Sequence, residues 1–221
     1  CIEDMWRVAI EIASRAGGDP GHTGLMGPMT PPEPARPDRL IVLETEGWAR
    51  TDDASRQAFA ALMENLERAG VTLIRRADHP WVETFERGID DAGHVCGTIT
   101  AWENRWGLRN LADRHPDGMS ARILATLAKA EAMTPDDYRA LVLRRGTARL
   151  NHATMAPLAD AAITFACPGP APLWPGDVAG QPLAANPTGD PVFNYPSSML
   201  GAPVVTVPLM AVGGLPVGLQ I

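Results

Sequence analysis

The opening segment of the chain has the apolar pattern of an amphipathic helix. Its apolar residues recur with a helical period: Ile2, Met5, Trp6, Ala9 and Ile12. This spacing is typical of one helix face, so we expect a first helix with one buried face. The connector 17–37 that follows is rich in glycine and proline, which excludes regular helix there. It is either an interdomain linker or an ordered surface crossover.

The next part of the chain alternates apolar and amphipathic segments. Residues 39–43 read as a short strand buried on both faces, and residues 71–74 supply a second strand. Between them, Thr51 is expected to cap a helix that begins near Asp52, and Gly70 to end it. The core positions of this helix are Phe59, Leu62, Met63 and Leu66. A strand, a helix and a strand with short joints predict a βαβ unit with parallel strands.

A helical pattern then runs through residues 80–157. Ser120 is expected to cap one helix of this stretch. Thr134, followed by Pro135 and two acidic residues, is a stronger sign of a helix start. Two tryptophans lie four positions apart on a predicted helix, which favours packing in a core or cleft over a ligand site: Trp102 and Trp106.

The C-terminal third returns to strand patterns. Residues 161–165 form an apolar run typical of a buried strand, and residues 204–208, four of which are β-branched, are expected to form another strand. A turn at 213–216 is expected to lead into a last strand at 217–221. The final thirty-one residues read PVFNYPSSMLGAPVVTVPLMAVGGLPVGLQI. This stretch resembles a late signature of the amidase-signature family.

The resemblance implies an α/β protein with the amidase-signature fold, a mixed β-sheet flanked by helices. The resemblance covers essentially the whole chain in the order of its helices and strands, but only the final thirty-one residues are specific to the family. It implies that residues 1–221 are the C-terminal part of a single amidase-signature domain, truncated at both ends. The helices of 80–157 would then form a layer over the substrate pocket, and the connector 17–37 would be an ordered surface crossover.

Composition narrows the classes of partner. The net charge is -7 and no basic stripe offsets it, which argues against a nucleic-acid surface or an anionic membrane surface. No apolar run approaches the roughly 20 residues of a membrane span. The cysteines are odd in number and widely spaced, as expected for reduced thiols in a cytoplasmic protein: Cys1, Cys96 and Cys167.

The catalytic motifs of the family do not occur in this sequence. Amidase-signature enzymes use a nucleophilic serine, a second serine in a cis peptide within a GGSSGG-like loop, and an upstream lysine. The sole lysine, Lys129, lies in an amphipathic segment and is expected to be solvated. The pair Ser197-Ser198 lacks the flanking glycines that would bring oxyanion-hole donors close, so we expect it to pack a helix against the sheet. We assign no catalytic residue to this chain.

The best candidates for substrate contact surround a long loop rich in proline and glycine. By resemblance, the residues before the late strand pass near the substrate pocket, which makes Thr188, Asp190 and Asn194 candidate substrate-binding residues. An alternative for Asp190 is that it only organises the turn before Pro191. Trp174 either shapes the pocket wall or packs against the loop.

The resemblance implies an enzyme that hydrolyses a carboxamide C–N bond through an acyl-serine intermediate, without metal or organic cofactor. The expected partner is a small-molecule amide, and the full-length enzyme could form a homodimer. Alternatives are the amidase subunit of a tRNA-dependent amidotransferase and a truncated remnant without catalysis. The histidines have no metal-ligand spacing, and the pairs Arg75-Arg76 and Arg144-Arg145 are interpreted as solvated surface.

Overall fold

The computed structural model describes residues 1–16, 26–173 and 189–221. The chain divides into two compact units, Cys1–Arg36 and Pro37–Ile221. Each unit is described by itself. The connector 17–37 lies partly outside the described residues.

The first unit contains helix α1 (Ile2–Ala16), as the sequence predicts. The Trp6 indole N–H donates to the Pro28 carbonyl at 2.9 Å, which ties the helix to the segment after it. Ile10 is buried, but Ile2, Met5 and Ile12 are each more than half exposed. The expected buried face is therefore wrong for these three residues, because the described part of this unit contains no second element that covers them.

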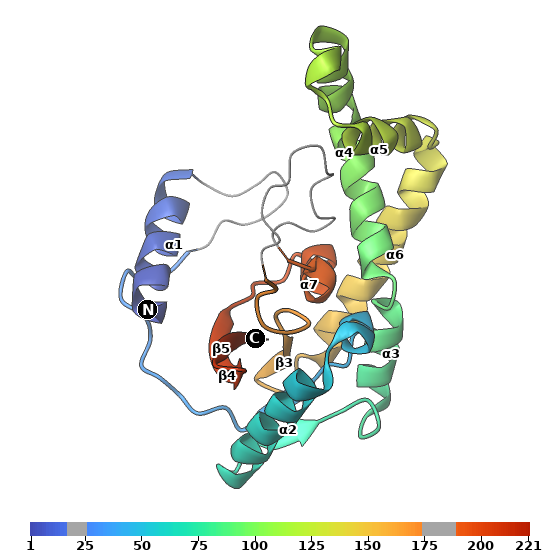
Figure 1. Cartoon of the computed structure of the whole chain (residues 1–221). Coiled ribbons are helices and arrows are strands. Elements are labelled where there is room, and N and C mark those ends of the chain that lie inside the picture. The colour runs from blue at the N-terminus through green and yellow to red at the C-terminus, as the bar shows by residue number, and fades with distance from the viewer. Residues whose placement is uncertain (17–25, 174–188) are drawn as a thin grey trace. The chain divides into compact units, whose positions relative to one another are not determined.

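The second unit is built on a mixed five-stranded sheet with the order β2-β1-β3-β5-β4 (Figure 1). Its strands are β1 (Arg39–Val42), β2 (Thr72–Ile74), β3 (Ala161–Phe165), β4 (Thr206–Val212) and β5 (Leu215–Gln220). β1 pairs in parallel with β2 and β3, whereas β5 pairs antiparallel with β3 and β4. The predicted parallel βαβ unit and the mixed sheet are both confirmed.

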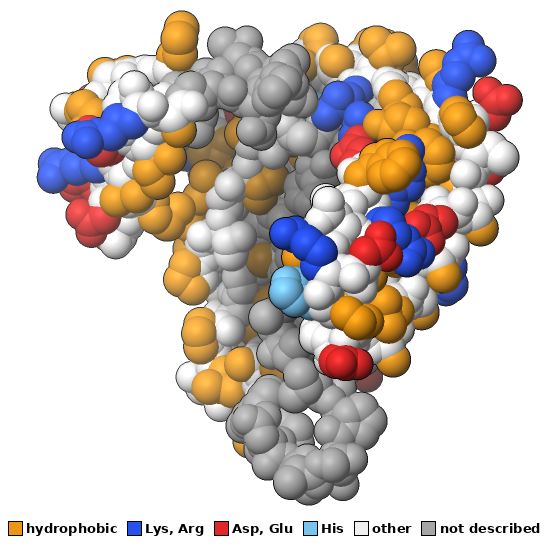
Figure 2. All heavy atoms as spheres, turned by 90° about the horizontal axis from the view of Figure 1, so that it is seen from above, with side chains coloured by type: hydrophobic (Ala, Val, Ile, Leu, Met, Phe, Trp, Pro, Cys, Tyr) orange, Lys and Arg blue, Asp and Glu red, His pale blue; other side chains and the backbone are white. Residues whose placement is uncertain are grey.

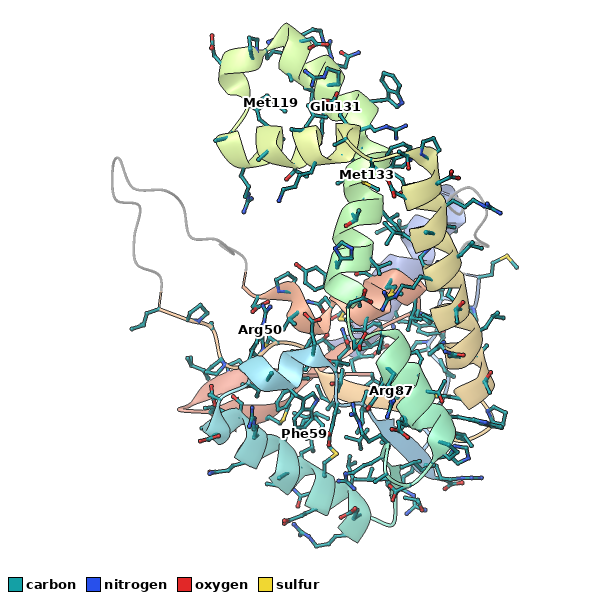
Figure 3. The ribbon with its side chains drawn as sticks, turned by 90° about the vertical axis from the view of Figure 1, so that its right-hand side faces the viewer. Arg50, Phe59, Arg87, Met119, Glu131 and Met133 are labelled. Carbon is teal, nitrogen blue, oxygen red and sulfur yellow. The ribbon has the colours of Figure 1, made fainter. Side chains whose placement is uncertain are left out.

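Both faces of the sheet are covered, which explains why β1 is apolar along its length. Leu40 and Val42 pack in one core with helix α2 (Asp53–Arg68), while Ile41 and Leu43 pack in a second core with the helical layer. Successive strand residues point to opposite faces, so a strand covered on both sides carries no polar alternation. Figure 3 shows Phe59 projecting from α2 toward the sheet.

The start of α2 differs by one residue from the prediction. Asp52, and not Thr51, is the N-cap, because its carboxylate accepts the Ser55 N–H at 2.7 Å. Thr51 is buried and donates its hydroxyl to the Gly47 carbonyl at 3.1 Å. Gly70 follows the helix with a positive φ of 85°, as expected of a terminating glycine.

The predicted helical stretch forms a layer on the other side of the sheet (Figure 1). It consists of α3 (Pro80–Gly88), α4 (Ala92–Arg114) and α6 (Pro135–Met155), while α5 (Ala121–Glu131) packs against α4 away from the sheet. Ser120 caps α5, and Thr134 forms a full capping box with Asp137 at the start of α6. Of the helices in the described ranges, none is both long and apolar enough to cross a membrane.

The two tryptophans of α4 have different surroundings. Trp102 stacks on Tyr138 of α6, with ring centroids 5.6 Å apart, so its predicted packing role is confirmed. Trp106 is 73% exposed, so it does not pack in a core, but it lines a surface cleft with Trp102, Glu131 and Met133, which agrees with the predicted cleft.

The final hairpin confirms two predicted strands but shifts their bounds. β4 begins at Thr206, not at residue 204, and continues to Val212. Leu215 and Pro216 belong to β5 and not to the turn. Gly213 and Gly214 have φ values of 57° and 79°, so the turn needs only these two glycines and leaves the next residues free to pair.

A short helix, α7 (Tyr195–Leu200), follows the 3-10 turn η3 (Pro191–Phe193). Phe193, the last residue of η3, is fully buried and contacts Phe165 of β3, with ring centroids 5.5 Å apart. A Cβ atom on Gly47, in the 3-10 turn η1 (Glu46–Arg50), would lie 2.8 Å from the Phe193 ring. The ring therefore occupies the space that a side chain at Gly47 would need.

A buried carboxylate connects the end of β1 to α3. Glu86 of α3 accepts the Glu44 N–H at 2.6 Å and is also bound by the Arg76 guanidinium. The Glu86 side chain is 1% exposed, whereas that of Arg76 is 47% exposed. Interpreting Arg75-Arg76 as solvated surface is thus incomplete, because Arg76 neutralises a carboxylate in the core.

We expect Gly47→Ala to destabilise the chain by about 1–3 kcal/mol, because the new methyl group overlaps the Phe193 ring. Gly107→Ala is the matched control. Nothing lies within 4 Å of a Cβ at Gly107 in α4, so it should stabilise the chain by about 0.5–1 kcal/mol. Urea unfolding measures both changes. Equal effects of the two substitutions would contradict the proposed overlap.

We expect wild-type stability to fall relative to Glu86→Gln as pH rises from 4 toward 7. Burial raises the pKa of Glu86, although the Glu44 N–H and Arg76 oppose this shift. A carboxyl with a raised folded-state pKa contributes stability that is present below the unfolded pKa and lost as pH rises through the folded value. Unfolding free energies of both proteins across this range test the sign. A wild-type free energy of unfolding that rises relative to that of Glu86→Gln as pH increases would contradict it.

Candidate functional site

Helix α7 lies between two cavities. The helix cavity, of about 450 Å³, is enclosed by α4, α5, α6 and α7. The sheet cavity, of about 260 Å³, lies between β3, α3, α6 and α7. Tyr195 and Ser198 line the helix cavity, whereas Ser197 and Leu200 line the sheet cavity. Neighbouring helix positions point in different directions, so the serine pair is divided between the two cavities.

The helix cavity has the more varied chemistry. Its apolar wall includes Ile99 and Leu108 of α4. The other side chains of the wall that carry polar or sulfur atoms are Cys96, Thr100, Glu103, Asn104, Thr126, Arg145, Tyr195 and Ser198. A mainly pre-formed cavity with a few polar groups among apolar ones is typical of small-molecule sites.

Close packing fixes the position of α7 in this wall. A Cβ atom on Gly93 of α4 would lie 2.9 Å from the Tyr195 ring, so the glycine allows the two helices to approach. The Cys96 thiol lies 3.6 Å from the Tyr195 carbonyl. At the other end of α7, the Arg149 side chain donates to the Leu200 carbonyl at 2.7 Å. Both ends of α7 are therefore held by the helical layer.

Two of the predicted substrate-binding residues lie on the turn that enters α7. The Asp190 carboxylate accepts the Val192 N–H at 3.1 Å and forms an ion pair with Arg50 at 2.9 Å (Figure 3). This geometry agrees with the alternative that Asp190 organises the turn. Asn194 is exposed, and its side-chain oxygen accepts the Gln220 amide N–H at 3.1 Å. Asn194 does not line either cavity, although its partner Gln220 lines the sheet cavity and the next residue, Tyr195, lines the helix cavity. Thr188 and Trp174 lie outside the described residues.

The residues considered as nucleophile or base have local roles. The Ser197 hydroxyl donates to the Asn194 carbonyl at 3.1 Å, a bond within the first turn of α7. Lys129 is exposed on α5, as expected. The expected packing of a helix against the sheet falls to Met199, which is fully buried in one core with Ile41 of β1, whereas Ser198 is exposed.

Two ionisable groups give the helix cavity its charge. Glu103, at the exposed rim, accepts the Tyr138 hydroxyl at 2.7 Å, and this bond raises the pKa of Tyr138. Arg145 is half-buried on α6. Burial raises the pKa of the Cys96 thiol, and the Arg145 charge opposes that shift. Both residues line the helix cavity.

Sequence reasoning missed Arg145. The pair Arg144-Arg145 was interpreted as solvated surface, and this holds for Arg144, which forms an ion pair with Asp91 at 2.7 Å. Arg145 lines the helix cavity instead. Its place on α6 in line with Tyr138 and Leu141 was the available signal, since those two residues pack against the apolar core. Figure 2 shows Arg side chains of the visible face interleaved with Asp and Glu.

The sheet cavity is mainly apolar. His152 lines it beside Phe85, and burial lowers the pKa of this histidine. Among the described residues, the buried Thr45 hydroxyl has no hydrogen-bond partner, whereas Thr164 donates to the Leu43 carbonyl at 2.9 Å. No cluster of three or more possible metal ligands occurs in the parts of the chain that the structure describes.

Comparison with solved structures identifies the fold. An amidase aligns with 86% of the chain at 23% identity and a TM-score of 0.68. A bacterial aryl acylamidase of the amidase-signature family aligns with 84% at 16% identity and a TM-score of 0.56. A 6-aminohexanoate cyclic dimer hydrolase aligns with 86% at 16% identity and a TM-score of 0.56.

The chain spans 42%, 39% and 41% of these three proteins, in the same order. It therefore has part of the amidase-signature fold, as the resemblance implied. No family model matches the sequence, and no curated protein matches it.

Proposed function

We propose that this chain is part of an amidase that hydrolyses a carboxamide C–N bond through an acyl-serine intermediate. The chain provides scaffold and one wall of the substrate pocket, and it does not provide the nucleophile. The observation that carries the proposal is the helix cavity beside the turn into α7, within a fold shared with amidases. Fold similarity alone is an analogy, so the cavity has to support the function.

The cavity supports an amide substrate through its mixture of groups. An amide has one carbonyl acceptor and N–H donors, and a buried site must satisfy both. The hydroxyls of Thr100 and Ser198 can donate and accept, and the Asn104 side chain offers both kinds of group. The apolar residues Ile99 and Leu108 exclude water from the same wall. These groups bind and orient a substrate without taking part in bond cleavage.

The bond formed with Gln220 leaves Asn194 able to bind substrate as well. Its side-chain oxygen accepts from Gln220, while its amide N–H groups donate to no group of the described residues. Asn194 directly precedes Tyr195 in the cavity wall. We therefore keep Asn194 as the substrate-binding candidate on this turn. Asp190 orients it through the η3 cap and the Arg50 ion pair.

The first test compares the complete gene product that carries this chain with residues 1–221 alone. We expect the complete product to release ammonia or amine from a panel of simple carboxamides, and residues 1–221 alone to release none. The reason is that Ser197 and Lys129 have the local roles described above. Release by residues 1–221 that Ser197→Ala abolishes would refute the assignment of the nucleophile elsewhere. A complete product that is inactive on every amide would favour a non-catalytic remnant.

The second test separates substrate contact from turn geometry. In the complete gene product, Asn194→Ala should lower kcat/KM by about 5-fold to 150-fold, as for one lost polar contact. Gln220→Ala is the matched control, because it removes the same Asn194–Gln220 bond from the other side. We expect its effect to be smaller and uniform among amides. Equal losses for both variants would show that Asn194 acts only through the turn.

A further inference from the structure

The arginines of α6 differ in how their charges are satisfied. Arg144 forms ion pairs with Asp90 and Asp91, and Arg149 donates to the Leu200 carbonyl. Arg145 has neither an ion pair nor a hydrogen bond among the described residues. It is nevertheless half-buried, and it faces the helix cavity. A guanidinium that is partly withdrawn from water without a partner is costly, so it calls for an anionic ligand.

The residues around Arg145 also favour the binding of an anionic ligand. The cavity wall near it is apolar at Ile99 and Leu108 and neutral at Thr100 and Ser198. In such a medium an ionic attraction is stronger than in water. The only carboxylate that lines the described cavity is Glu103 at the exposed rim, and it already accepts the Tyr138 hydroxyl. Arg145 thus remains available for a ligand.

We propose that the helix cavity binds substrates that carry a carboxylate in addition to the scissile amide, and that Arg145 holds this carboxylate. The inference rests on the proposed amidase function and names its substrate class. A guanidinium presents parallel N–H donors that match the two oxygens of a carboxylate. The carboxylate contributes only to substrate binding, and it undergoes no covalent change.

The charge balance of the cavity favours a carboxylate over a phosphate. Arg145 is the only cationic side chain that lines the described cavity, and Glu103 adds one negative charge at the rim. A monovalent carboxylate is matched by a single guanidinium. A phosphate, with a charge near -2 at neutral pH, would leave an excess of negative charge beside Glu103.

The test uses two small amides of the same length, succinamate and the neutral succinamide. In the complete gene product, Arg145→Gln should lower kcat/KM for succinamate by about 10-fold to 150-fold, mainly through KM. Its kcat/KM for succinamide should change by less than about 3-fold. Arg144→Gln is the matched control, because Arg144 pairs with Asp91 outside this cavity, and it should leave both values near wild type. Thermal melting of both variants confirms that they fold.

Three outcomes separate this inference from the proposed function. Selective loss of succinamate turnover in Arg145→Gln supports the inference. Equal losses for succinamate and succinamide, or none, overturn it while amidase activity itself stands. If neither amide is hydrolysed, calorimetric titration of the same proteins with succinamate decides. Binding that Arg145→Gln abolishes supports the carboxylate site. No binding, or displacement of succinamate by an equal concentration of inorganic phosphate, overturns it.

Discussion

The packing of Phe193 against Gly47 is the contact on which the position of the candidate site depends. The ring is fully buried, contacts Phe165 of the sheet and occupies the space beside Gly47 that any side chain would fill. Losing such a ring from a core costs about 3–5 kcal/mol, so the turn has few alternatives. Because α7 begins two residues later, the same contact fixes where Tyr195 and Ser198 enter the helix cavity.

The short helix α7 separates two cavities and contributes side chains to both. Residues on different sides of this helix face the helix cavity and the sheet cavity. The helix is too short to be stable by itself, and its ends depend on the Gly93 approach and on the bond from Arg149. The site is therefore a property of the helical layer and the sheet together. Neither layer alone would position α7.

The arginines of the chain fall into two groups, those with a carboxylate or carbonyl partner and those without one among the described residues. Most arginines are satisfied locally, as in the Arg76–Glu86 pair that joins α3 to the end of β1. Such pairs neutralise charge in the core and contribute nothing to ligand binding. Arg145 differs because the packing of α6 against α4 and α7 turns it inward, where the described chain supplies no carboxylate partner. The proposed role of Arg145 in ligand binding rests on this isolation and not on its residue type alone.

Local patterns in the sequence determined the secondary structure and the class of fold. The apolar run of β1, the Thr134 capping box and the glycines of the last hairpin each act within a few residues, so they could be read directly. The mixed character of the sheet was predicted only from the family resemblance.

The site required contacts between distant segments. Arg145 is separated from Tyr195 by fifty positions, and Asn194 is separated from Gln220 by 26. Only the tertiary structure decided these contacts, because the packing of α4, α6 and α7 sets which side of each helix meets a cavity and which meets water.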